Sequence, residues 1–310
     1  MKTFIQSSNS AFPPLDYASW KDTLHTLHMW TQIIGKIRLK SMPWQNHSWH
    51  SALYITDKGL STGSIPYGNG IFAIEFDFSN HQLVVSSTFT NDRMMKLYDR
   101  SVADFYQEVM ITLASMGIQV DIYAAPNEVE KSIPFVENEI NKSYDSQAVV
   151  NFWQAAISIH NVFLNFRSQF IGKCSPVHFF WGAFDIALTR FSGRPAPLHP
   201  GGAANMPQDV MQEAYSHEVS SCGFWPGGDS FPQAAFYSYC YPTPEAFGKQ
   251  SVLPEEAFYS EEMGEYFLAY DAVRNSPHPE KMLMEFLQTT YEAVAETGNW
   301  NREQLEKKWK

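Results

Sequence analysis

The sequence predicts an α+β fold made of two pseudo-symmetric halves, each a helix, an antiparallel sheet and a second helix. The first observation is an apparent internal repeat. Ile34-Gly35-Lys36 precedes a histidine-containing segment at 47–53, and Ile171-Gly172-Lys173 precedes another at 178–184. Both copies continue as short alternating segments and end in an amphipathic helix. The second observation is that the segments are joined by hairpin-length connections without crossover helices, which indicates antiparallel sheets.

The first half, residues 1–125, is predicted to open with an N-terminal arm and a helix. Apolar residues recur at helical spacing from Trp20 to Ile37, Asp16 can cap the helix, and Pro43 blocks its continuation. Ser101 and Asp104 form a capping box for a second helix. Strands are expected at residues 50–56, 71–78, 82–87 and 118–123.

Residues 126–145 are polar and contain prolines, so we expect them to connect the halves. The second half, residues 146–310, repeats the same order, beginning with a helix over 146–170. Two long loops, 192–214 and 242–263, set it apart, and long loops in compact domains are often functional. Strands are expected at 177–181, 184–191, 215–222, 235–241 and 266–270, before a final helix that begins at Pro277.

Composition narrows the functional classes. The net charge of −11 disfavours nucleic acid and anionic membranes as partners, because both need clustered basic residues. No apolar run approaches the length of a membrane span, and the first residues lack the pattern of a secretory signal. Three cysteines without a Cys-x-x-Cys pair are typical of free thiols in a reducing compartment. We therefore expect a cytoplasmic protein whose partner is a small molecule, and the oligomeric state is left open.

The candidate catalytic residues are ionisable side chains set within apolar segments. The phosphate-binding, dinucleotide-binding, nucleophile-elbow and His-Glu-x-x-His motifs are absent. A buried charge is costly unless it is paired, so such groups are either internal pairs or parts of a site. On regular strands His217 and Glu218 point to opposite faces, as do Asp185 and Arg190. The candidates are His178, His217, Glu218 and Asp185.

Other residues are candidates for binding a metal or a substrate. His47, His50, His178 and His217 could ligate zinc or iron, and a set of hydrogen-bonded core histidines is the alternative. The guanidinium groups could hold an anionic substrate, and the indoles could wall its cleft. The residues assigned to substrate binding are Arg190, Arg194, Trp181 and Trp225.

Several longer segments resemble a known bacterial family. They are the stretches at 172–182, 189–194, 215–220 and 223–227, together with 46–50 and 101–106. They are similar to a family identified only as a domain of unknown function, DUF5996, and the resemblance covers nearly the whole chain. It implies no activity. It does imply that the histidines and charged residues above belong to the family pattern, and that Cys222 stands where alanine is usual.

Three functions are compatible with these observations. We favour an enzyme that acts on a small, possibly anionic molecule in an aromatic-lined cleft between the halves, with histidines as metal ligands or acid–base groups. A non-catalytic binding protein for a small molecule is the second. The third is an interaction protein whose acidic loop around Glu255, Glu256, Glu261 and Glu262 docks a basic partner.

Overall fold

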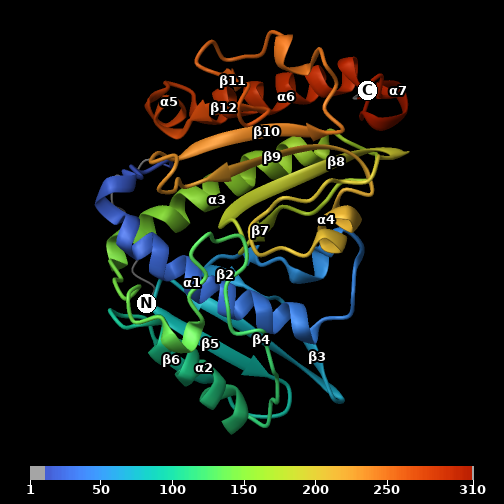
Figure 1. Ribbon diagram of the computed structural model, residues 1–310. Coiled ribbons are helices and arrows are strands. Elements are labelled where there is room, and N and C mark those ends of the chain that lie inside the picture. The colour runs from blue at the N-terminus through green and yellow to red at the C-terminus, as the bar shows by residue number, and fades with distance from the viewer. Residues whose placement is uncertain (1–10, 309–310) are drawn as a thin grey trace.

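A computed structural model describes residues 11–308 and contains two antiparallel sheets with helices packed around them (Figure 1). The first sheet has the order β1-β2-β4-β5-β6, with β3 paired to β4; the second has the order β11-β12-β10-β9-β8-β7. The first sheet comprises β1 Tyr54–Ile55, β2 Gly59–Ser61, β3 Ile65–Tyr67, β4 Gly70–Asp77, β5 Gln82–Ser87 and β6 Arg93–Lys96. The second comprises β7 His178–Phe180, β8 Asp185–Pro195, β9 His217–Trp225, β10 Ala235–Tyr241, β11 Phe258–Ser260 and β12 Glu265–Ala269. An α+β fold with antiparallel sheets is therefore confirmed.

The helices lie beside and between the sheets. In Figure 1, α1 crosses the middle of the molecule, α2 lies beside the first sheet, and α3 and α6 lie beside the second. The α-helices are α1 Tyr17–Ser41, α2 Val102–Ser115, α3 Ser146–Ser168, α4 Gln208–Ala214, α5 Tyr270–Asn275, α6 Pro279–Thr297 and α7 Arg302–Leu305. Short 3₁₀ turns are η1 Asn46–Ser51, η2 Phe135–Glu137 and η3 Phe247–Lys249.

Helix α1 is buried on all sides over its second half. The ten residues from Met29 to Arg38 are buried without interruption, so this stretch has no solvent-facing stripe. Towards the first sheet, Trp30 stacks on Phe105 of α2 with ring centroids 4.6 Å apart. Towards the second half, Gly35 lets the Trp181 indole approach the helix backbone. The helix therefore contributes to the packing of both sheets.

The second sheet has two chemically different faces because its side chains alternate. One face carries apolar residues such as Leu188, Phe224 and Phe236, and α3 and α6 contact this sheet. The other face carries Asp185, Tyr237, Tyr239 and Glu265 by the same alternation. This second face bears the candidate site described below.

Each half runs from a helix through an antiparallel sheet to a further helix. Leu53, just before β1, pairs with Phe179 of β7, and their backbones exchange two hydrogen bonds of 2.9 and 2.8 Å. The relation of the halves as copies, and the boundaries at 126–145, stay predictions. None of the helices within residues 11–308 is long and apolar enough to cross a membrane.

Several predicted elements were wrong in detail. Of the expected strand at 50–56, only Tyr54–Ile55 form strand β1. Residues 50 and 51 belong to the 3₁₀ turn η1, in which His47 and Ser48 have φ of 58° and 56°. The segment 118–123 has no strand pairing. The loop at 192–214 contains the end of β8 and helix α4, and the loop at 242–263 contains η3 and β11. The last long helix begins at Pro279, after the short α5. Of the N-terminal arm, residues 1–10 lie outside the described part, and Phe12 is fully buried.

Candidate functional site

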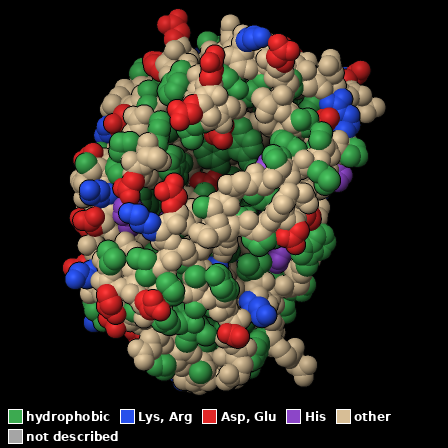
Figure 2. All heavy atoms as spheres, in the orientation of Figure 1, with side chains coloured by type: hydrophobic (Ala, Val, Ile, Leu, Met, Phe, Trp, Pro, Cys, Tyr) green, Lys and Arg blue, Asp and Glu red, His purple; other side chains and the backbone are tan. Residues whose placement is uncertain are grey.

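The face of the second sheet that points away from α3 and α6 carries a group of carboxyl and hydroxyl side chains. Strand pairing sets Tyr237 opposite Gly223, and Gly223 opposite Ala187, so these residues share one face. Asp185, two residues before Ala187, lies on the same face. Figure 2 shows a hollow over this part of the molecule, with hydrophobic and acidic side chains inside it.

A glycine allows a tyrosine to reach an aspartate across a strand. A side chain at Gly223 would collide with the ring of Tyr237, so the ring lies directly over the backbone of β9. From this position the Tyr237 hydroxyl donates a hydrogen bond to Oδ2 of Asp185 on β8. Asp185 is only 7% exposed, so this hydroxyl is a principal polar partner of a buried carboxyl.

A second hydroxyl network lies beside the first. The Tyr239 ring stacks on Tyr237 with centroids 6.0 Å apart, and its hydroxyl is 2.7 Å from that of Tyr215. On the neighbouring strands, the hydroxyls of Thr189 and Ser221 are 3.0 Å apart. The face therefore offers aromatic rings together with hydroxyls that can both donate and accept hydrogen bonds.

Three carboxyl groups at this face have raised pKa values. Burial raises the pKa of Asp185 to about 6, against the lowering effect of the Tyr237 hydrogen bond. Burial, with a smaller contribution from the negative charge of Asp185, raises the pKa of Glu128 and of Glu265 to about 7. Within residues 11–308 no lysine, arginine or histidine forms an ion pair with any of the three. Their charge is therefore uncompensated near neutral pH.

Glu128 lies at the wall of a cavity of about 520 Å³. Its backbone has φ of 57° and donates a hydrogen bond of 2.8 Å to the carbonyl of Ala204. Its carboxyl lies against Gly182, where a side chain would displace it. Glu128 as a whole residue is exposed to solvent, and the burial that raises its pKa reflects the protein atoms gathered around the carboxyl.

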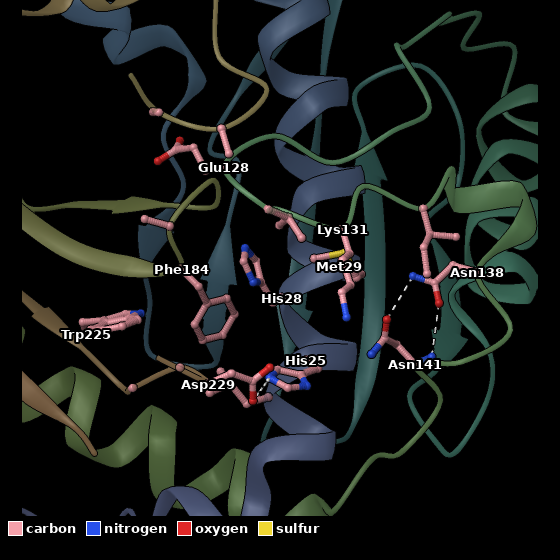
Figure 3. A pocket seen from close by; sticks show the side chains of 18 residues that line it. His25, His28, Met29, Glu128, Lys131, Asn138, Asn141, Phe184, Trp225 and Asp229 are labelled. Carbon is pink, nitrogen blue, oxygen red and sulfur yellow. Dashed lines mark hydrogen bonds and ion pairs between the residues drawn. The ribbon is translucent and has the colours of Figure 1, made fainter. Parts of the chain in front are cut away.

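The cavity lies between α1, the segment after Glu128 and the end of β9. In Figure 3, His25, His28 and Met29 project from α1, with Phe184 and Trp225 on one side and Asn138 and Asn141 on the other. Phe224 of β9 pairs with Ile186 of β8. The next residue of β9, Trp225, therefore lies on the same face of the sheet as Asp185. Glu128 and Trp225 both line this cavity, whereas Asp185 and Glu265 do not. A volume of this size suits a small molecule.

The predicted histidines gather around an indole. The rings of His47 and His178 lie 5.4 and 5.8 Å from that of Trp49, and His47 lies 5.9 Å from His217. His50 is held instead in its own turn, with Nδ1 3.2 Å from the backbone nitrogen of Gln45. Among residues 11–308, no three His, Cys, Asp or Glu side chains are arranged to hold a metal ion.

His178 is 1% exposed, and neither ring nitrogen has a hydrogen-bond partner in the protein. Burial, with the nearby charge of Arg38, lowers the pKa of His178 to about 4. The imidazole is therefore neutral at physiological pH.

The remaining predicted site residues lie outside the cavity wall, except Trp225. Arg190 points to the helix-covered face, with its guanidinium 3.4 Å from the ring centroid of Phe166. Arg194 forms an ion pair of 2.6 Å with Glu218 and also donates to the carbonyl of Gly298 after α6. Trp181 is buried and donates from Nε1 to the carbonyl of Ser51. The opposite orientations predicted for Asp185 and Arg190 are present.

Sequence reasoning missed Glu128, Glu265 and the tyrosines. One signal was available in the strand at 235–241, where tyrosines occupy every second position and therefore share one face of the sheet. Glu128 carried no such signal, because its place depends on contacts with Gly182 and Ala204, both distant in sequence.

Residues 12–307 match the model of a family of unknown function, DUF5996, so the chain belongs to that family. No curated protein matches the chain. No solved structure matches it either.

Proposed function

We propose that this member of DUF5996 is an enzyme that carries out general acid–base chemistry on a small molecule at the polar face of the second sheet. Asp185, Glu128 and Glu265 are the acid–base groups, and the tyrosine hydroxyls orient the substrate. The observation that carries the proposal is a set of three carboxyls with raised pKa values and without ion pairs, of which Glu128 lines a cavity.

The pKa values suit this chemistry because a general acid or base works best when its pKa lies near the working pH. Asp185, at about 6, is the more acidic group and serves as the base. Glu128 and Glu265, at about 7, hold a proton more often and can donate it. Two environments that separate the pKa values of neighbouring carboxyls are a common pattern of acid–base assignment.

The charge of the site favours a neutral or positively charged substrate. An anion would add to the negative charge of three carboxyls. The arginines that suggested an anionic substrate are engaged elsewhere, Arg190 against Phe166 and Arg194 with Glu218. Aromatic rings beside hydroxyls and carboxyls suit a ligand with hydroxyl or amine groups.

We further propose that the two halves are related copies, as the repeat of Ile-Gly-Lys predicts. Each half contains a helix, an antiparallel sheet and a further helix, and reciprocal backbone bonds join Leu53, just before β1, to Phe179 of β7. On this proposal only the second half carries the candidate site, because the tyrosines and carboxyls of β8, β10 and β12 belong to the second sheet.

The test begins with the carboxyl groups themselves. Because the pKa values of these carboxyls are raised in the folded state, the folded protein retains protons between about pH 4 and pH 7 that the unfolded chain releases. Their stabilising contribution is fully present below about pH 4 and is lost as pH rises through 6 to 7. Asp185→Asn should reduce this loss of unfolding free energy by at most about 3 kcal/mol. The pKa of Asp185 differs by about two units between the unfolded and folded states, and each unit corresponds to about 1.4 kcal/mol. Urea unfolding of wild type and variant at pH 4 and pH 7.5 measures the difference.

Glu261→Gln, at an exposed surface position, is the matched control and should leave the pH dependence unchanged. Carbon-13 NMR titration of the labelled carboxyls assigns the pKa values, and ordinary values near 4 for all three would refute the proposal. A library of neutral and cationic small molecules is then screened by thermal shift. Stabilising compounds are followed by proton NMR for turnover, which should vanish in Asp185→Asn; binding without turnover would favour a non-catalytic binding protein.

A further inference from the structure

We propose that Lys173 is an amine nucleophile that forms an imine with a small aldehyde or ketone, with His47 accepting its proton. This site shares no residue with the carboxyl site. Lys173 lies beside Phe191 of β8, whose backbone N–H donates a hydrogen bond of 3.0 Å to the carbonyl of Lys173.

The hydrogen bonds of His47 determine where its proton lies. Nδ1 is 3.0 Å from the carbonyl oxygen of Ala214, which can only accept, so Nδ1 carries the proton. Nε2 then presents its lone pair, and Nζ of Lys173 lies 2.5 Å from it. The lysine therefore donates to a neutral imidazole, which is the arrangement of a nucleophile and its base.

The turn that carries His47 is held in an unusual conformation. His47 and Ser48 both have positive φ, which is unfavourable for residues with a side chain. The backbone N–H of His47 donates to Oε1 of Glu213 at 2.7 Å, which ties the turn to α4. Two consecutive residues in this region persist only where surrounding contacts hold them, and such positions cluster at functional sites.

The surroundings of Lys173 partly remove water from its amine. Nζ lies 4.8 Å from the ring centroid of Phe191 and 5.5 Å from that of Trp49. Burial lowers the pKa of Lys173, and the negative charge of Glu213 opposes this effect. His47 and His217 are the other titratable groups at this position. The side chain remains exposed, so a small reagent can reach it.

The reaction balances without a cofactor. The lone pair of the neutral amine attacks the carbonyl carbon, and the imidazole of His47 accepts the proton that the nitrogen loses. His47 returns this proton to the alkoxide oxygen, which gives a neutral carbinolamine. Its hydroxyl then takes a solvent proton and leaves as water, while the nitrogen lone pair forms the C=N bond of the protonated imine. Sodium cyanoborohydride supplies the hydride that reduces this imine to a stable secondary amine in the assay.

Propanal with cyanoborohydride, applied to the full-length protein at pH 7, tests the proposal. Peptide mass spectrometry follows alkylation at Lys173 and at Lys249 and Lys281, whose side chains are 72% and 73% exposed. We expect Lys173 to react several-fold faster than both, because its lowered pKa leaves more of the amine free and His47 accepts the proton that the nitrogen loses. His47→Gln should bring Lys173 into the range of the reference lysines, and His50→Gln, in the same turn but without contact to Lys173, should not.

Alkylation of Lys173 no faster than that of Lys281 would overturn the proposal, as would an unchanged rate in His47→Gln. If that variant is unstable, the pH dependence of the wild-type rates decides instead. The rate at Lys173 should then reach half its maximum at a lower pH than at the reference lysines, and identical profiles would also reject the proposal.

Discussion

At the residue scale, the candidate site depends on one close approach. Tyr237 reaches Asp185 because Gly223 between them has no side chain and Ala187 has only a methyl group. The hydroxyl stabilises the ionised form of Asp185, which is why its pKa is about 6 despite strong burial. The glycine is thus part of the site even though it carries no functional group.

Gly223→Ala should therefore disturb both stability and chemistry. The added methyl group collides with the Tyr237 ring, and overpacking of this kind costs about 1 to 3 kcal/mol of unfolding free energy. Displacement of the ring breaks its bond to Asp185, so the pKa of Asp185 should rise above 6. Urea denaturation and carboxyl NMR measure the two effects. Tyr237→Phe is the matched variant, which should raise the pKa without the steric cost; an unshifted Asp185 in both would contradict this account.

At the scale of elements, local patterns predicted what local physics determines. The strand at 235–241 was predicted to the residue, and Ser101 does accept a hydrogen bond from the backbone of Asp104 at the start of α2. The turn at His47 could not be predicted, because its positive φ values depend on Glu213, far along the chain. The place of Glu128 is non-local in the same way. Most of the fold was thus accessible from the sequence, whereas most of the candidate site was not.

Helix α1 provides a case where packing outweighs propensity. In a solvent-exposed helix, alanine in place of glycine would gain about 1 kcal/mol. At Gly35 the added methyl group would collide with the buried indole of Trp181, whose Nε1 is held by the carbonyl of Ser51. We expect Gly35→Ala to destabilise the protein by at least about 1 kcal/mol net, measured by thermal unfolding. Lys40→Ala, at an exposed position near the end of the same helix, should change stability little, and a stabilised Gly35→Ala would show that the indole can move aside.

At the scale of the whole molecule, the halves recognised in the sequence share one hydrophobic core. The buried residues form one cluster that runs from Phe12 through both sheets to Trp300. Helix α1 has no exposed side over Met29–Arg38, so separating the halves would expose apolar surface on each. The bonds between Leu53 and Phe179 add a backbone connection at the same junction.

This shared core predicts that the protein unfolds in one step. Far-UV circular dichroism and tryptophan fluorescence should give coincident urea transitions, because the 9 tryptophans are distributed over both halves. Leu53→Ala removes a fully buried side chain at the junction and should cost about 2 to 5 kcal/mol. Both probes should shift together, since the loss affects the common unit. Leu198→Ala, at a side chain that is 80% exposed, is the control and should leave the midpoint unchanged. Two separated transitions in the wild type, or a shift of only one probe in Leu53→Ala, would mean that the halves are independent folding units.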